Sequence, residues 1–276
     1  MTSDDSPGPV VVGIDGSDAA IGAAEWAAKE AVHQDVPLRL VHVIQITDGP
    51  IASTGAYPAE KNYAETSLRA ACSAVAATGL PVKIDTAVLC GDVDSVLIAE
   101  SSNATLICVG SLGISRVASR VVGSTATTLA EHARCPVAII RRTEDGPLPE
   151  AAFIAAVLDD EPGDDEVMRW AMEEARVRRA PVLALGVWRW ALFKIGDEKF
   201  YRRLDHWLRR YPDVQVEVAS TRMSVTRYLE GYIGRVQLAV IDGADANQVA
   251  QLVGARRLPI STHADCSVLI VRGQHQ

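Results

Sequence analysis

The sequence predicts an α/β protein made of two related domains in tandem. Two observations lead to this fold class: the chain of 276 residues repeats itself, and each repeat alternates apolar segments with helical ones. A single domain holds roughly 100–150 residues, so the length allows two separate cores. Each repeat is thus expected to fold as a parallel sheet between layers of helices.

The repeat is visible at both of its ends. A shift of 144 residues gives seven identities in 29 aligned positions without a gap, among them Asp15 with Asp159. A shift of 131 residues gives seven more towards the end of the repeat. Recurrence of both ends argues against chance. We therefore predict domains at residues 1–141 and 152–276, joined by the polar, proline-containing linker 142–151.

Within the first repeat, apolar segments rich in β-branched residues are typical of buried strands, and alanine-rich or amphipathic segments are typical of helices. The predicted strands are 10–14, 38–44, 81–89, 104–110 and 136–141, and the predicted helices are 18–33, 60–78, 93–102 and 124–134. Five strands separated by helices predict a parallel sheet with helices on both faces. Such sheets bind ligands at the carboxyl ends of their strands, where the strand order reverses.

The second repeat has the same outline. Its predicted strands are 153–159, 180–188, 214–220, 236–243 and 266–272. Between the second and third of these, residues 188–211 carry Phe200, Leu204, Trp207 and Tyr211 at helical spacing, with arginines between them. We interpret this segment as an amphipathic helix packed on its own sheet. The alternative is an aromatic and basic surface for a partner or for the other domain.

Composition excludes several classes of protein. The net charge of −8 argues against nucleic-acid binding, which usually needs a basic stripe. No apolar segment is long enough to span a membrane, and the polar, acidic start has no basic region of the kind a secretory signal carries. The five cysteines form no CxxC pair and lie among apolar neighbours. We therefore expect buried, reduced thiols and no zinc site.

A glycine-rich segment after the fourth strand carries the clearest functional pattern. Gly110 and Gly113 follow an apolar strand, and Gly123 precedes a helix that begins with Ser124 and Thr125. Glycine lets backbone N–H groups approach a ribose or phosphate closely, and the positive end of a helix favours anions. Two further residues of the segment, Arg116 and Arg120, either contact phosphates or are solvated loop arginines.

Asp15 strengthens this interpretation. It ends the first strand, and the ends of strands one and four are neighbours at the switch point of such a sheet, so Asp15 is expected opposite Gly110. A carboxylate there can accept hydrogen bonds from a ribose hydroxyl or a base amine. The alternative role is a helix N-cap for residues 18–33, although Asp18 is better placed for that.

Together, VVVGIDGS, LVHVI and the spacing G-x2-G-x9-G-S resemble the universal stress protein family, in its ATP-binding subgroup and in its tandem form. The resemblance implies two Rossmann-like α/β/α sandwiches with strand order 3-2-1-4-5. It also implies that ATP, with Mg²⁺ held through its phosphates, is the ligand of the first domain. The implied contacts are Asp15, Val43, Val109, Gly110, Gly113, Gly123, Ser124 and Thr125. Leu112 departs from many relatives, which carry a polar or basic residue there.

The second domain departs further from the motif. Asp242 and Asp245 replace the first two glycines, and Ala255 and Arg256 stand where the first domain has its serine and threonine. Carboxylates facing a triphosphate repel it. We predict that this domain keeps the fold but not the nucleotide, and that Asp159 is a remnant or a cap.

The function that follows is a nucleotide-dependent regulator of stress response or signalling. The alternatives are a slow ATPase and an interaction module that has lost its ligand. The chain has no GxxxxGK(S/T) loop, no GxSxG elbow, no HExxH motif and no SGGxDS-type pyrophosphatase loop. His42, within a strand, is expected to be a hydrogen-bonded core residue rather than a general base.

Expected partners are an adenine nucleotide and a regulatory protein, with neither nucleic acid nor membrane. The last strand of each domain is expected to pair with its counterpart, within the chain as a pseudo-dimer or between chains as a homodimer. A cytoplasmic location is expected. The loop 46–62 is long and polar, and is expected to be either a lid over the crevice or an insertion.

Overall fold

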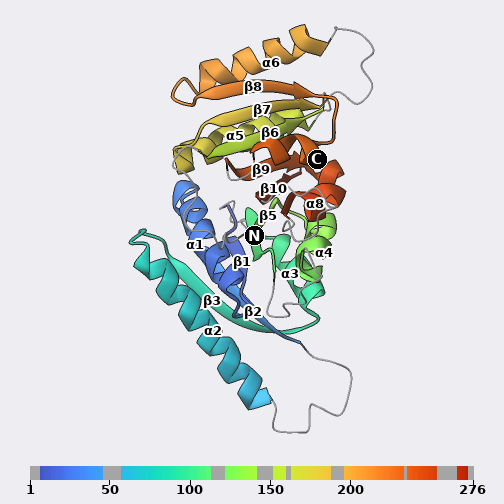
Figure 1. The fold of residues 1–276 in the computed structure, drawn as a ribbon. Helices are drawn as coiled ribbons and strands as arrows, with labels where there is room; N and C mark the ends of the chain where they lie inside the picture. Colours follow the sequence, from blue (N-terminus) through green and yellow to red (C-terminus); the bar gives the residue numbers. More distant parts are fainter. Residues whose placement is uncertain are drawn as a thin grey trace, which may run out of the picture. The chain divides into compact units, whose positions relative to one another are not determined.

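The computed structural model describes residues 7–45, 57–112, 122–141, 152–159, 163–187, 196–232, 235–253 and 266–272. The chain forms two compact units, Met1–Arg142 and Thr143–Gln276, so the boundary falls at the start of the predicted linker. Each unit is an α/β structure with a parallel sheet, as predicted (Figure 1). Each is described by itself below.

The strands of the first unit are β1 (Val10–Gly13), β2 (Leu38–Gln45), β3 (Ile84–Gly91), β4 (Leu106–Gly110) and β5 (Val137–Ile140). Its helices are α1 (Asp18–His33), α2 (Tyr57–Ala77), α3 (Val93–Ser101) and α4 (Ser124–His132). The strands follow the order β3-β2-β1-β4-β5, and all of their pairings are parallel. The order therefore reverses between β1 and β4, at the predicted switch point.

The core of the first unit lies where the central strands meet α1. Val10, Val12 and Leu106 are completely buried, as strands covered on both faces should be. The buried face of α1 is almost entirely alanine, which lets the helix axis approach the sheet closely. Helix α1 packs against α2 and α3 packs against α4, so helices cover both faces of the sheet (Figure 1).

The strands of the second unit are β6 (Phe153–Leu158), β7 (Val182–Val187), β8 (Val216–Thr221), β9 (Val236–Asp242) and β10 (Ser267–Val271). Its helices are α5 (Asp164–Arg178), α6 (Gly196–Arg210), α7 (Val225–Leu229) and α8 (Val249–Val253), with 3₁₀ helices η2 (Glu230–Tyr232) and η3 (Gly243–Gln248). The sheet order is β10-β9-β6-β7-β8, again parallel throughout. Read from the other end, this is the same 3-2-1-4-5 order.

Helix α6 confirms the simpler interpretation of the aromatic segment. Leu204, Trp207 and the following Tyr211 are all buried, so the apolar stripe packs within its own unit. The arginines border this stripe: Arg210 lies over the rings of Trp207 and Tyr211, at 5.9 and 5.8 Å. The side chain of Phe200 lies outside the described part of the structure.

Two expectations about the first unit were wrong in detail. Helix α2 begins at Tyr57, so residues 57–62 of the predicted loop are helical; residues 46–56 lie outside the described residues. The cysteines also differ from expectation. Cys108, Cys135 and Cys266 are buried, whereas Cys90 is exposed and Cys72 is half-buried. Strand β3 explains Cys90, because it is an edge strand whose side chains are largely open to solvent.

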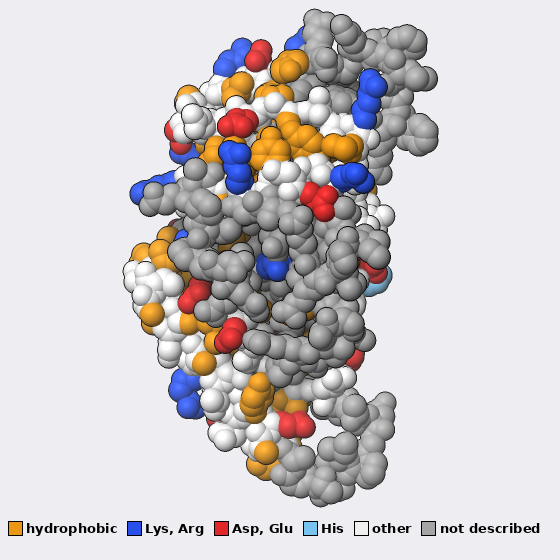
Figure 2. Space-filling model, in the orientation of Figure 1, with side chains coloured by type: hydrophobic (Ala, Val, Ile, Leu, Met, Phe, Trp, Pro, Cys, Tyr) orange, Lys and Arg blue, Asp and Glu red, His pale blue; other side chains and the backbone are white. Residues whose placement is uncertain are grey.

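Figure 2 shows basic and acidic side chains interspersed among the described residues of one face, without an extended area of one sign. None of the helices in the described ranges has the length and hydrophobicity that crossing a bilayer requires.

Candidate functional site

The first unit contains a cleft of about 400 Å³ at the carboxyl ends of β1, β2 and β4. This is the edge of the sheet where the strand order reverses, and where doubly wound folds bind their ligands. All of the described residues that the sequence singled out lie in its wall: Asp15, Val43, Val109, Gly110, Gly123, Ser124 and Thr125. The remaining candidate, Gly113, lies outside the described residues together with Arg116 and Arg120.

The turn from β1 to α1 forms one side of the cleft. The Asp15 carboxylate accepts a hydrogen bond from the backbone N–H of Ser17 at 2.9 Å, and the Ser17 hydroxyl accepts one from the N–H of Ala20 at 3.1 Å. Ser17 is therefore the N-cap of α1. Asp18, which the sequence favoured as the cap, is already the first residue of the helix. The alternative role of Asp15 as the cap was also wrong, because Ser17 lies two residues nearer to the helix.

The end of β4 approaches this turn so closely that a side chain at Gly110 would collide with it. A Cβ at Gly110 would lie 2.7 Å from the carbonyl carbon of Ala19 and 2.9 Å from the backbone nitrogen of Ala20. Glycine is needed here for close approach of two backbones. This contact brings the β1 turn and the β4 turn to the same edge of the cleft.

The opposite side of the cleft is formed by the start of α4. The backbone N–H of Gly123 donates to the carbonyl oxygen of Ser111 at 2.9 Å, which joins the two ends of the glycine-rich segment. Gly123 is the N-cap of α4 but supplies no side-chain hydrogen bond to it. The first N–H groups of this helix therefore lack a side-chain cap, and together with the helix dipole they form an anion-binding end.

An aromatic wall that the sequence did not reveal completes the cleft. Tyr63, on α2, lines it and donates its hydroxyl hydrogen to the carbonyl oxygen of Asp15 at 3.0 Å. Its ring meets the ring of His42 edge to face, with centroids 5.8 Å apart. Because Tyr63 lies 48 residues from Asp15 in the chain, neither strand ends nor glycine spacing points to it.

His42 is buried in this wall, with 8% of its surface exposed. The expectation of a core residue is confirmed, but the buried Nδ1 atom has no hydrogen-bond partner among the described residues, so the expected hydrogen bonding is incomplete. Burial lowers the pKa of His42 below its usual 6.5, while the Ile14 backbone and the Asp15 charge oppose this shift. The imidazole is therefore neutral at pH 7.

The described residues contain no group of three histidine, cysteine, aspartate or glutamate side chains that would hold a metal ion by themselves. Asp15, Ser124 and Thr125 supply scattered oxygen atoms around the cleft. Any Mg²⁺ here would take most of its ligands from phosphates and water, which is its usual habit.

Comparison with known proteins places this geometry in a family. The model of the universal stress protein family matches residues 8–141. The universal stress protein Rv2624c of Mycobacterium tuberculosis is 47% identical over 263 residues, covering 95% of this chain and 96% of that protein. The chain belongs to the universal stress protein family. A second relative from the same organism, Rv3134c, is 40% identical over 270 residues and covers 95% of both chains.

The tandem arrangement is shared with a solved member of the family. The crystal structure of a universal stress protein from Archaeoglobus fulgidus superposes with a TM-score of 0.70 over 98% of both chains, at 15% sequence identity. At that identity the likeness concerns the fold, which agrees with the two sheets described above.

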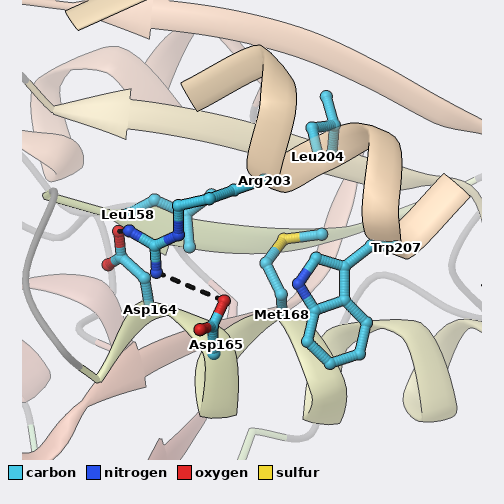
Figure 3. Close-up of a pocket in the computed structure, with 7 residues that line it drawn as sticks. All are labelled: Leu158, Asp164, Asp165, Met168, Arg203, Leu204 and Trp207. Carbon is cyan, nitrogen blue, oxygen red and sulfur yellow. Dashed lines mark hydrogen bonds and ion pairs between the residues drawn. The ribbon is translucent and has the colours of Figure 1, made fainter. Parts of the chain in front are cut away.

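In the second unit of this tandem universal stress protein, an open pocket of about 460 Å³ lies between Ser224 before α7 and Gln248 of η3. A much smaller cavity lies between α5 and α6. This cavity, beside the end of β6 and the start of α5, measures about 20 Å³. Helix α6 contributes Arg203, Leu204 and Trp207 to it, and Figure 3 shows Arg203 reaching toward the carboxylates at the start of α5. Arg203 lies 3.2 Å from Asp164 and 3.3 Å from Asp165.

The aspartates of the second unit are engaged within the protein. Asp242 accepts a hydrogen bond from the backbone N–H of Ala244 at 2.8 Å and so caps η3, and Asp245 accepts one from the Gln248 side chain. The carboxylate of Asp242 lies so close to Gly163 that a Cβ at that glycine would overlap with it. The positions of Gly254 and its two successors are outside the described residues.

Proposed function

We propose that this universal stress protein binds ATP, with Mg²⁺ carried on the phosphates, in the cleft of its first unit, and acts as a nucleotide-dependent regulator. The observation that carries the proposal is the convergence of Asp15, Gly110 and the uncapped start of α4 on one cleft at the switch point. These three parts match three parts of a nucleotide: a carboxylate for hydroxyl or amine donors, a close backbone, and an anion-binding end.

The cleft has room for such a ligand, since pockets for small molecules of drug size span roughly 300–1,000 Å³. The described residues that line it include a carboxylate but no lysine or arginine, so none of these side chains attracts the phosphates by a positive charge. Affinity would therefore come from aimed N–H groups and from the cation that accompanies the phosphates. In the second unit, Asp242 and Asp245 stand where the first unit has its first two glycines, which supports a domain that keeps the fold without the ligand.

Isothermal titration of the whole chain with Mg–ATP tests this function. Asp15→Ala and Gly123→Val are each expected to weaken binding more than about tenfold, equivalent to about 1.4 kcal/mol. The first variant removes the carboxylate, and the second places a β-branched side chain at the anion-binding end. Asp159→Ala is the matched control, because Asp159 is the counterpart of Asp15 in the second repeat. The proposal fails if the unmodified protein binds no ATP, or if Asp159→Ala weakens binding as much as Asp15→Ala.

Analysis of the nucleotide after incubation with the protein separates a binding protein from a slow ATPase. Nucleotide recovered after timed incubation should still be ATP if the cleft acts as a sensor. Neutral His42 is buried and held in the sheet, so the described residues offer no exposed histidine in the cleft to activate water.

A further inference from the structure

We propose that Tyr63 is the base-contacting residue of the cleft, and that its ring makes the site select nucleotides over phosphates without a base. This inference rests on the proposed nucleotide function and adds a specificity residue outside the glycine-rich segment. Tyr63 lies on α2, in the wall shared with Asp15 and Val43. No other phenylalanine, tyrosine or tryptophan of the described residues lines this cleft.

The ring of Tyr63 is fixed and yet accessible, which is what a stacking surface requires. Its hydroxyl is tied to the Asp15 backbone at 3.0 Å, and its edge-to-face contact with His42 supports it from the sheet. The side chain nevertheless stays 46% exposed in a cleft wall. A ring held by its tip and by a neighbouring ring loses little further entropy when a base stacks on it.

The turn below Tyr63 is built around it. Gly16 has φ of +90°, and a Cβ there would lie 2.8 Å from the Ser67 hydroxyl and would overlap with the hydroxyl of Tyr63. Only glycine adopts this conformation without strain and leaves room for the tyrosine. The turn that carries Asp15 and the helix that carries Tyr63 are thus fitted to each other.

The second unit offers an internal comparison. Helix α6 follows the second strand of its sheet as α2 does, and it also carries an aromatic ring, that of Trp207, at a small cavity beside α5. There the ring is only 6% exposed and lies beside Met168 (Figure 3). In the first unit the helix presents its ring and leaves the cleft open. Stacking of an aromatic side chain on a base contributes about 1–3 kcal/mol.

The test compares Mg–ATP with Mg–tripolyphosphate, which has the phosphates but no base, by titration of the whole chain. Tyr63→Leu is expected to weaken ATP binding about 5- to 150-fold while tripolyphosphate binding changes less than twofold. Tyr63→Phe, which keeps the ring, should stay within about threefold for ATP. The control is Tyr57→Leu, on the same helix, 52% exposed and absent from the cleft wall; it should change neither affinity.

A second measurement does not depend on tolerance of leucine. Tyr63→Trp should show a change in tryptophan emission on saturation with ATP that exceeds the change in Tyr57→Trp. Provided that ATP binds the unmodified protein, three results would overturn the inference. Tyr63→Leu could keep its affinity for ATP, or it could lose affinity for ATP and for tripolyphosphate equally. The third result is an unchanged emission of Tyr63→Trp on saturation with ATP. Absence of ATP binding by the unmodified protein would instead overturn the proposed function.

Discussion

Gly110 and Asp242 occupy corresponding positions in the two units. Each lies against one residue near the start of a helix, α1 or α5, and glycine occupies the strand position in the first unit and the helix position in the second. In the first unit the glycine lies on the strand end and faces Ala19; in the second the aspartate lies on the strand end and faces Gly163. Only one member of each pair can carry a side chain into the shared space. The first arrangement leaves bare backbone toward the cleft, and the second places a carboxylate against the start of α5. The glycine thus lies on the strand end in the first unit and before the helix in the second.

Protonation of His42 should lower the free energy of unfolding of the first unit. Its pKa is lowered in the folded protein by burial, so protons bind the unfolded chain more readily, and the stability it contributes is complete above about pH 6.5. As pH falls below that value the contribution is lost. Asp15 and the Tyr63 ring face it.

Urea unfolding at pH 7, 6 and 5 checks this expectation. His42→Gln removes the titrating group, and the five other histidines are common to both proteins. The unmodified protein should lose stability relative to His42→Gln as the pH falls from 7 to 5. Parallel pH dependences for the two proteins would show that the imidazole does not titrate differently in the folded state.

At the scale of elements, α1 and α5 share a buried glutamate at one helix position. Glu30 and Glu174 are identical positions of the repeat, and both are buried. In α5 the Glu174 carboxylate accepts a hydrogen bond from Arg178 at 2.7 Å, one turn further on, and the arginine is buried as well. A buried carboxylate is tolerated only when it is paired.

Removing one partner of this pair should destabilise the second unit strongly. Arg178→Met leaves Glu174 buried without its cation, and the expected loss is about 3–5 kcal/mol in the free energy of unfolding. The double variant Glu174→Leu with Arg178→Met should recover most of that loss, because no uncompensated charge remains. Denaturation in urea measures both. Equal losses in the single and double variants would mean that packing, rather than charge, determines the stability here.

Sequence patterns predicted the helices and strands because the local order of apolar and polar residues indicates which side chains are buried. Val10–Gly13 and Leu106–Gly110 are apolar throughout, and the alanine face of α1 is equally plain. The long-range parts of the cleft were not predictable in this way. Tyr63 reaches Asp15 across 48 residues, and the start of α2 at Tyr57 follows a polar segment with no strong helix pattern. The cap at Ser17 was missed because three polar candidates stand within four residues and only geometry distinguishes them.

At the scale of the whole molecule, the repeat yields the same strand order in both units but different surroundings at the start of the equivalent helices α1 and α5. In the second, the Arg203 guanidinium stands between Asp164 and Asp165, so a cation of the protein already neutralises the carboxylates at the start of α5. Leu204 and Trp207 fill the remaining space with apolar groups. A nucleotide at the start of α5 would have to break these ion pairs.

Saturation of the chain should therefore require a single ATP. Titration calorimetry, with protein concentration fixed by amino-acid analysis, is expected to give a stoichiometry of about one nucleotide per chain, because the glycine-rich spacing occurs in the first repeat and is replaced by aspartates in the second. Arg203→Met removes the cation from the second crevice but leaves Trp207 and Leu204 in place, so it should not raise this number. Asp15→Ala should abolish most of the heat because it alters the open cleft. A stoichiometry of two, or a second binding event that disappears in Asp159→Ala, would show that the second unit opens to its own ligand.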